Sequence, residues 1–302
     1  MITYKSAEDL SRKIRHLQDK SLKVSFVPTM GGLHEGHLAL MKLAQQKSDV
    51  VVVSIFVNPT QFGQNEDLNK YPRTLEEDIY LLETLDIDIL FTPSVEVIYP
   101  SNDLESYELG FLDTILCAKT RPGHFNGVAQ VVNRLFDIVH PDIAVFGEKD
   151  YQQLMIINLI NKNRKDDVKV ISHEIIRERD GLAMSTRNQY LSFNDRENAK
   201  KIYQNLLGIK TDFLRGMDIY SSIKKAKDNL SQFSKLDYLE ARNSKDLRDI
   251  DNKTDEIILL CATYLGETRL IDNLIFRRKC LKLLMRQKHI LPNYSKIKTK
   301  LI

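Results

Sequence analysis

Short apolar segments alternate with amphipathic stretches through the first half of this 302-residue chain, and this alternation constrains its fold most. The apolar segments carry hydrophobic residues at successive positions, which is typical of strands buried on both faces of a parallel sheet. We predict these strands at residues 24–28, 49–58, 88–91, 143–147 and 168–175. Helical spacing of apolar residues predicts helices at 38–46, 74–85, 128–139 and 152–161. The pattern indicates a doubly wound, Rossmann-like α/β domain over residues 1–175.

The pattern changes after this domain. Two amphipathic helices are predicted in "DRENAKKIYQNLLGIKTDFLRG" and "DIYSSIKKAKDNLSQF", followed by short strands in "KLDYLEARN", "DEIILLCATYL" and "TRLIDN". This order predicts a smaller α+β domain over residues 176–275. Residues 276–302 form a basic extension of unknown role, in which "FRRKCLKLLMRQKHIL" has the pattern of an amphipathic helix.

Composition excludes several classes of protein. Hydrophobic content of 42% and charged content of 28% are typical of a globular domain, and the longest apolar runs are too short to span a membrane. The net charge of +3 is too small to indicate nucleic-acid binding by itself. The charged start of the chain does not fit a signal peptide, and Cys117, Cys261 and Cys280 form no CxxC pair. We therefore expect a cytoplasmic protein.

The segment "VPTMGGLHEGH" follows the first predicted strand and opens the next helix near Gly36. Such a glycine-rich turn would aim backbone N–H groups and a helix N-terminus at one point, which is a typical anion site. His34 and His37 would lie on the same side and could donate to phosphate oxygens. An incidental pair stays open as an alternative. A zinc pair would need a third ligand and a zincin-type spacing, which this segment lacks.

Two further segments follow predicted strands. In "IFVNPTQFG", Gln61 offers both a donor and an acceptor for a hydroxy acid or an amine, or it is a solvated turn residue. In "FGEKDYQQL", Gly147 permits a tight turn, Lys149 could neutralise phosphate, and Asp150 could hold Mg²⁺ or a ribose hydroxyl. Gln153 would face the same cavity. The alternative is an acidic helix start that only complements the helix dipole.

A fourth segment, "RERDGLAMSTRN", lies in the loop that leads into the second domain. Its run of Ser185, Thr186 and Arg187 suits a triphosphate, because two hydroxyls and a guanidinium can share the charge of the phosphoryl oxygens. Taken alone, such a run is commonly just a loop. Four such segments in one α/β chain point to a common site.

Together these segments resemble the pantothenate synthetase family of ATP-dependent ligases, within the HxGH nucleotidyltransferase superfamily. The resemblance lies in "VPTMGGLHEGH", "IFVNPTQFGQNEDLNKYPRTLEED", "RPGHFNGVAQVV", "FGEKDYQQL", "DGLAMSTRNQYLS" and "TRLIDN", in the family's order. It implies that "MSTRN" acts as the mobile loop of this superfamily. The chain departs from the family at Gly32, where Ala is common, and at Thr186, where a second Ser is common.

The resemblance implies a role for each matching residue. It implies His37 as a proton donor in adenylate formation, with His34, Lys149 and Arg187 as further catalytic residues. The ATP site that it implies consists of Met30, Gly31, Gly32, Leu33, His34, Glu35, Gly36, His37, Gly147, Glu148, Lys149, Asp150, Ile176, Met184, Ser185, Thr186 and Arg187. Gln61 and Gln153 are implied as pantoate-binding residues, and Gln61 also lies by the β-alanine position.

The implied reaction belongs to pantothenate and coenzyme A biosynthesis. Pantoate and ATP would form pantoyl adenylate and pyrophosphate, and β-alanine would then displace AMP. Mg²⁺ is expected with the ATP phosphates, near Asp150, rather than at a dedicated protein site. The resemblance also implies a homodimer, while membrane or nucleic-acid partners are not expected. Other hypotheses are a related nucleotidyltransferase, an aminoacyl-tRNA-synthetase-like adenylate former and a nucleotide-binding protein without turnover.

Overall fold

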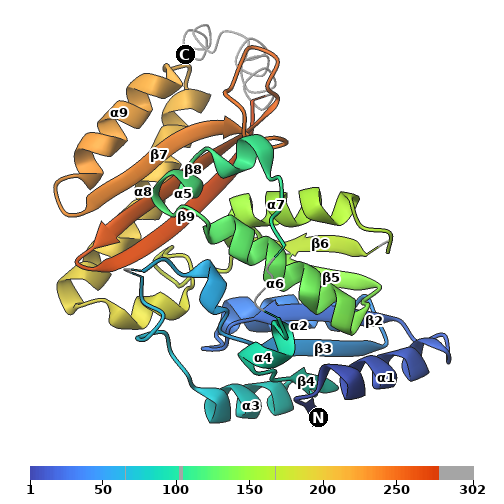
Figure 1. Cartoon of the computed structure of the whole chain (residues 1–302). Coiled ribbons are helices and arrows are strands. Elements are labelled where there is room, and N and C mark those ends of the chain that lie inside the picture. The colour runs from blue at the N-terminus through green and yellow to red at the C-terminus, as the bar shows by residue number, and fades with distance from the viewer. Residues whose placement is uncertain (65, 102–104, 167, 279–302) are drawn as a thin grey trace, which may run out of the picture.

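Six parallel strands form the first sheet, in the order β1-β4-β3-β2-β5-β6 (Figure 1). The computed structural model describes residues 1–278 except 65, 102–104 and 167. The strands are β1 (Ile2–Tyr4), β2 (Val24–Thr29), β3 (Val50–Ile55), β4 (Ile89–Phe91), β5 (Ile143–Gly147) and β6 (Lys169–His173). From β2 the chain builds the sheet outward through β3 in one direction and through β5 in the other. The point between β2 and β5 is therefore the topological switch point, where ligands of such folds gather.

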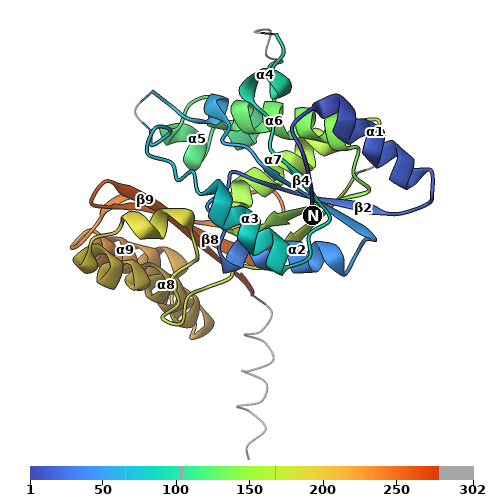
Figure 2. The same cartoon turned by 90° about the horizontal axis from the view of Figure 1, so that it is seen from below.

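Helices cover both faces of this sheet, as the doubly wound prediction requires (Figure 2). One layer contains α1 (Ala7–Gln18), α6 (His124–Val139) and α7 (Tyr151–Lys162), whose apolar side chains form one core with the sheet. The other layer contains α2 (Glu35–Gln45) and α3 (Leu75–Thr84). The predicted fold class is confirmed.

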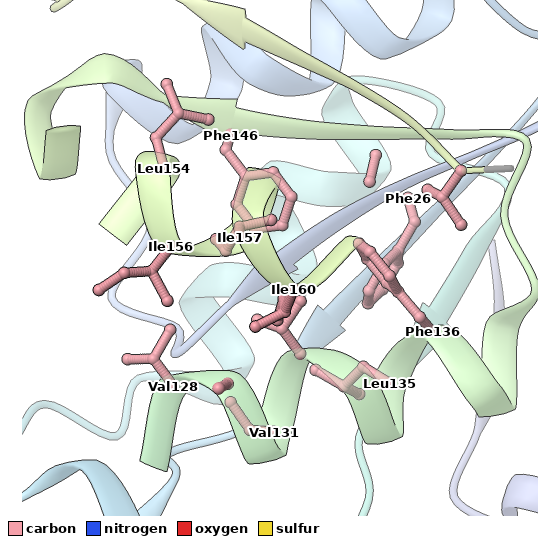
Figure 3. Close-up of a cluster of buried hydrophobic side chains, with 14 of the residues drawn as sticks. Phe26, Val128, Val131, Leu135, Phe136, Phe146, Leu154, Ile156, Ile157 and Ile160 are labelled. Carbon is pink, nitrogen blue, oxygen red and sulfur yellow. The ribbon is translucent and has the colours of Figure 1, made fainter. Parts of the chain in front are cut away.

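Alternate residues of the central strands enter different cores, which explains why these strands are apolar at nearly every position. Phe26 and Val52 pack under α6 and α7, whereas Val27 and Val53 pack under α2 and α3. Figure 3 shows the larger core, where Phe26, Phe136 and Phe146 meet the aliphatic side chains of α6 and α7. Side chains of successive strand residues point to opposite faces, so burial on both faces needs an unbroken apolar run.

The second domain is an antiparallel sheet, β7-β8-β9, with two helices on one face. Its elements are α8 (Phe193–Leu214), α9 (Ile219–Leu230), β7 (Lys235–Asn243), β8 (Glu256–Leu265) and β9 (Thr268–Arg277). Ile257 and Leu259 of β8 pack against the helices, while Ile258 and Leu260 join the core of the first domain. The two domains thus share an apolar interface, and β9 lies beside the turn that follows β5 (Figure 1).

The structure contains elements that the apolar pattern did not predict. The N-terminal β1 and α1 belong to the first sheet and to its helix layer. Helix α6 begins at His124 rather than at residue 128, after Gly123 in a left-handed conformation with φ of 80°. Short helices occupy the connections: α4 (Val95–Ile98), α5 (Cys117–Thr120) and the 3-10 turns η1 (Pro59–Gln61), η2 (Gly110–Asp113), η3 (Glu148–Asp150) and η4 (Thr186–Tyr190).

The boundary of the C-terminal extension differs from the expected one. Phe276 is buried in the core of the second domain, because β9 continues through Arg277. The amphipathic helix expected in the basic extension lies outside the described residues, as does Cys280, whereas Cys117 and Cys261 are free and buried. Among the described residues no helix is both long and apolar enough to cross a bilayer.

Candidate active site

A cavity of about 240 Å³ lies at the switch point, where the carboxyl ends of β2 and β5 meet the loop entering the second domain. The expected residues that line it are Met30, His34, Gly36, His37, Gln61, Gly147, Glu148, Lys149, Asp150, Gln153, Ile176, Met184, Ser185, Thr186 and Arg187. All four segments therefore meet at one cavity. Four expected residues are not among its lining residues, namely Gly31, Gly32, Leu33 and Glu35.

The backbone amides of the glycine turn are directed at a protein carboxylate. The N–H groups of Gly32 and Leu33 donate to the two carboxylate oxygens of Asp78, at 3.0 and 2.8 Å. Asp78 is buried on α3 and is only 2% exposed. The expectation that these two amides point at a bound anion is therefore wrong, because Asp78 already occupies that position. The positive φ of Gly32, 61°, shapes the turn around this carboxylate.

The two histidines cap helix α2 in a way that fixes their tautomers. Nδ1 of His34 accepts the N–H of Gly36 at 3.1 Å, and Nδ1 of His37 accepts the N–H of His34 at 3.3 Å. An accepting Nδ1 carries no proton, so each neutral imidazole is protonated at Nε2. The ring centroids are 4.1 Å apart. The cap thus leaves Nε2–H on each ring as its remaining polar group, and both side chains line the cavity.

The electrostatic environment keeps both imidazoles neutral. Burial and the ammonium of Lys149 lower the pKa of His34 to about 4. Burial, His34 and Lys149 hold the pKa of His37 well below its usual value. A neutral imidazole in this position is a hydrogen-bond donor through Nε2–H, and a bound polyanion would favour its protonation.

The turn η3 places Lys149 and Asp150 at the same cavity. The Lys149 ammonium is 3.9 Å from the Asp150 carboxylate, and these side chains are 23% and 48% exposed. Lys149 is thus accessible to a ligand while its charge acts on both histidines. Asn273 of β9 donates to the carbonyl oxygens of Glu148 and Lys149, at 2.8 and 3.1 Å.

The Ser185–Arg187 segment is held closed over the glycine turn. The Thr186 hydroxyl donates to the Gly32 carbonyl at 2.9 Å. Arg187 forms a bidentate pair with Asp67, at 2.7 and 2.8 Å, and its guanidinium lies 5.4 Å from the centre of the Tyr71 ring. In this state Arg187 reaches the cavity with its charge already compensated by Asp67.

The amide of Gln61 is oriented by two neighbours. Its Nε2 lies 2.9 Å from the sulfur of Met30, and its Oε1 accepts from the Asn58 amide at 3.3 Å. Gln153, on the first turn of α7, lines the same cavity, whereas its neighbour Gln152 is buried and bonds to backbone groups before and at the start of α5. The structure therefore brings together the two amides that the sequence singled out.

Several lining residues were not singled out by the sequence analysis. Arg121 pairs with Glu66 at 2.5 Å and lies 2.9 Å from Nε2 of His124, whose Nδ1 is 2.7 Å from the carbonyl oxygen of Gln61. Burial, followed by Arg121, lowers the pKa of His124 to about 4. Both residues belong to "RPGHFNGVAQVV", which resembled a family motif but had no individual role assigned. Asn58 had a signal too, since it is the last residue of the strand predicted at residues 49–58.

Comparison with known proteins adds the decisive observation. The family model for pantoate–β-alanine ligase matches residues 2–275. The chain belongs to the pantoate–β-alanine ligase family. A curated pantothenate synthetase of Vesicomyosocius okutanii is 50% identical over 264 residues, covering 87% of this chain and 93% of that protein. One of Shewanella woodyi is 45% identical over 282 residues, covering 92% of this chain and 100% of that protein.

Solved structures of the family share the fold. A pantothenate synthetase of Thermus thermophilus is 39% identical, with a TM-score of 0.84 over 91% of this chain and 99% of that one. The pantoate–β-alanine ligase of Francisella tularensis, solved as a complex with "Beta-gamma ATP" and β-alanine, is 38% identical, with a TM-score of 0.76 over 91% of this chain and 97% of that one.

Membership of this family establishes the activity. The chain is a pantoate–β-alanine ligase, an enzyme that joins pantoate to β-alanine in pantothenate biosynthesis. The match along nearly the whole described chain favours this activity over the other adenylate-forming hypotheses. Among the described residues, no group of three or more His, Cys, Asp and Glu side chains is arranged to hold a metal ion.

Proposed function

We propose that ATP binds across the switch point, with its triphosphate against His34, His37 and Lys149. Two Nε2–H donors and the accessible Lys149 ammonium converge there, and the Asp150 carboxylate lies 3.9 Å from this ammonium. Such preorganised donors stabilise charge that develops during phosphoryl chemistry. The complex of the Francisella tularensis ligase with "Beta-gamma ATP" supports ATP as the nucleotide for this family member.

His37 is our candidate proton donor. Its imidazole is neutral in the unliganded enzyme, because burial and Lys149 oppose its protonation. A triphosphate placed beside it would raise its pKa, since an opposite charge favours the charged form. Protonation would take place at Nδ1, which would give up its bond from the His34 amide, and His37 could then pass its Nε2 proton to the departing pyrophosphate, while His34 donates to a phosphate oxygen.

The remaining phosphate ligands would come from the Ser185–Arg187 segment. Arg187 is held by Asp67 in this structure, so we expect it to exchange this carboxylate for a phosphate as ATP binds. Planar guanidinium groups suit both partners, because carboxylates and phosphates accept two parallel hydrogen bonds. The hydroxyl of Ser185 lies next to it and caps η4 through the Arg187 amide.

We assign pantoate to the part of the cavity between Gln61 and Gln153. The two amides can satisfy the hydroxyls of a dihydroxy acid. Valine and leucine side chains of α6 line the same cavity, and they suit the two methyl groups of pantoate. These side chains are Val128, Val131, Val132 and Leu135. β-Alanine would bind beside Gln61, and the Francisella tularensis complex supports β-alanine as a ligand of this family.

The proposed reaction has two steps. A carboxylate oxygen of pantoate attacks the α-phosphorus of ATP, the bond to pyrophosphate breaks, and pantoyl adenylate forms. The amine of β-alanine then attacks the activated carbonyl, loses a proton, and AMP leaves. The protein's contribution is positioning and charge compensation, and each effect is of the order of several kcal/mol.

Mg²⁺ would accompany the triphosphate. Mg²⁺ in nucleotide sites is commonly held by one or two carboxylates together with phosphate oxygens and water. The Asp150 carboxylate fits this part, because it lines the cavity, is half exposed and lies beside Lys149. The ion would neutralise phosphate charge there.

The observation that carries this proposal is the pair of capped, neutral imidazoles at the switch point. We expect pantoate-dependent exchange of pyrophosphate into ATP, without β-alanine. His37→Ala should slow this exchange by about 10²–10⁴-fold. His37→Gln is the sharper variant, because Gln at this helix position can keep the capping bond to the His34 amide while removing the imidazole.

The matched control is His16→Ala, which removes an exposed imidazole of α1 that does not line the cavity. Exchange at the parental rate in a folded His37→Gln enzyme would remove His37 from the mechanism. Absence of pantoate-dependent exchange in the parent would remove the adenylate route.

We propose that the enzyme is a cytoplasmic homodimer, as the family resemblance implies. The measurement is the molar mass in solution by light scattering. A monomer at concentrations where the enzyme is active would contradict it.

A further inference from the structure

Two consecutive polar residues in the middle of β9 are almost completely buried. Asp272 is 3% exposed and Asn273 is 4% exposed. Burying such groups is costly unless each finds hydrogen-bonding partners. Successive residues of a strand point to opposite faces, so these two side chains leave β9 in different directions. Their partners are the turn that carries Lys149 and the hairpin that leads to the Ser185–Arg187 segment.

Asn273 holds the turn that carries Lys149. Its side-chain amide donates to the carbonyl oxygens of both Glu148 and Lys149, at 2.8 and 3.1 Å. The turn η3 has only three residues and no side chain of its own capping its start. These two bonds from the second domain therefore restrain the backbone from which the Lys149 ammonium projects.

Asp272 holds the hairpin that leads to Ser185. Its carboxylate forms a bidentate pair with Arg177, at 2.7 and 2.8 Å. Arg177 also donates to the Gly181 carbonyl at 3.0 Å and lies 3.7 Å from the centre of the Tyr203 ring. Since Arg177 and Ala183 are paired by a β-bridge, this ion pair restrains the base of the hairpin just before the Ser185–Arg187 segment.

The two anchors are also linked to each other. One of the two guanidinium nitrogens that bind Asp272 also donates to the backbone carbonyl oxygen of Asn273 at 3.0 Å. The backbone N–H of Asn273 in turn donates to the Asp272 carboxylate at 2.7 Å. Burial raises the pKa of Asp272, while Arg177 and the more distant Lys149 act in the opposite direction. The anchors and the Lys149 turn thus form one connected unit.

We propose that Asp272 and Asn273 are positioning residues that align the Lys149 turn with the Ser185–Arg187 segment for adenylate formation. This role rests on the ATP-binding roles proposed above. One strand of the second domain sets the distance between two phosphate-binding segments of the chain. Losing an anchor should therefore impair the step that uses the triphosphate, and spare the attack of β-alanine on a preformed adenylate.

The test variant is Asn273→Asp, which keeps the shape of the side chain but replaces the N–H donors by an oxygen facing two carbonyls. Asn273→Ala is the second variant, in case the introduced charge prevents folding. We expect kcat/KM for ATP in pantoate-dependent pyrophosphate exchange to fall by about 10²-fold, the typical effect of a 1 Å misplacement. The single-turnover rate of β-alanine with enzyme-bound pantoyl adenylate should stay within about twofold of the parent.

The matched control is Asp237→Asn, an equally conservative change at a buried carboxylate of the same sheet. Asp237 accepts from Arg269 and from Thr120 of the first domain, and none of these three residues lines the cavity. If Asn273→Asp slows pyrophosphate exchange and β-alanine attack to the same degree, and Asp237→Asn does so too, Asn273 has only a structural role and the proposal is overturned.

Lys149→Ala separates this proposal from the assigned ATP site. If Lys149→Ala slows exchange but both Asn273 variants keep the parental kcat/KM for ATP, the alignment role alone is wrong. If Lys149→Ala has no effect on exchange, the assignment of the turn to ATP fails, and the alignment role fails with it. Selective loss of exchange in the Asn273 variants and in Lys149→Ala supports both.

Discussion

Gly127 is the point at which the backbone of helix α6 touches the turn that carries Gln61. A Cβ at this position would lie 2.3 Å from the carbonyl oxygen of Thr60 and 2.8 Å from the backbone nitrogen of Gln61. Both atoms are backbone, so no flexible side chain can move away. The Gly127 carbonyl also accepts the Asn58 amide at 3.0 Å. The methyl group added by Gly127→Ala would therefore clash directly with the backbone of η1.

The expected displacement follows from contact distances. A comfortable carbon–oxygen contact is about 3.3 Å, so the turn must move by about 1 Å relative to the 2.3 Å contact. A shift of this size at a substrate-positioning group costs about 10²-fold in rate. Overpacking costs about 1–3 kcal/mol of stability, whereas Ala in place of Gly returns up to about 1 kcal/mol of helix propensity. We therefore expect a large loss of activity with a net destabilisation of only about 0–2 kcal/mol.

The assay is kcat/KM for pantoate together with the free energy of unfolding in urea. Gly208→Ala is the matched control, because it makes the same change within helix α8 where a Cβ meets nothing within 4 Å. We expect Gly208→Ala to gain up to about 1 kcal/mol of stability at unchanged activity.

One result would refute this reasoning. Parental kcat/KM for pantoate in Gly127→Ala, in an enzyme where Gln61→Ala is impaired, would show that the contact with η1 does not set the position of Gln61. Impairment of Gly208→Ala to the same degree would instead attribute the loss to Gly-to-Ala changes in general.

Three further predictions concern other parts of the site. Gly32→Ala should lower kcat/KM for ATP, because its Cβ would lie 2.4 Å from the Thr186 methyl group. Thr186→Ser removes this methyl group, so a double-mutant cycle on kcat/KM should give a favourable coupling free energy of about 1–2 kcal/mol between the two changes. Asp78→Asn should destabilise the fold by about 1–3 kcal/mol in urea unfolding, since one glycine-turn amide loses its acceptor, and an unchanged midpoint would contradict this. Because burial and Arg121 lower the pKa of His124 to about 4, its contribution to stability is complete above pH 6.5 and is lost as the pH falls toward 4. His124→Asn should therefore lessen the fall in unfolding free energy between pH 7 and pH 5, and an equal fall in both proteins would exclude His124 as its source.

The sequence predicted the strands and helices best where burial is most uniform. Residues 143–147 are apolar at almost every position because both faces of β5 are covered, and the predicted and observed bounds agree. The short edge strand β1 escaped prediction, since its three residues are mostly exposed and carry no apolar run. Helix α6 was predicted too short, because Phe125 is the one buried apolar side chain of its first turn and the contact with η1 is made by Gly127, which has no side chain.

The candidate site also has features that the sequence predicted and features that it did not. Chain order placed His37, Gln61 and Lys149 after strands, and parallel strands in one sheet bring their carboxyl ends to one edge. Other contacts of the site could not be inferred, because the interacting residues are far apart in the sequence. Asp78 takes the amides expected to bind an anion, and Asp67 holds Arg187.

The amino-acid sequence by itself determined the fold class, the family and the segments that meet at the cavity, because apolar periodicity and motif order are local properties of the chain. Only the tertiary structure decided the order of the strands, the tautomers and lowered pKa of His34 and His37, and the attachment of the Lys149 turn to Asn273. These depend on which groups approach within hydrogen-bonding distance and on how far water is excluded from them, and both are set by packing between segments far apart in sequence.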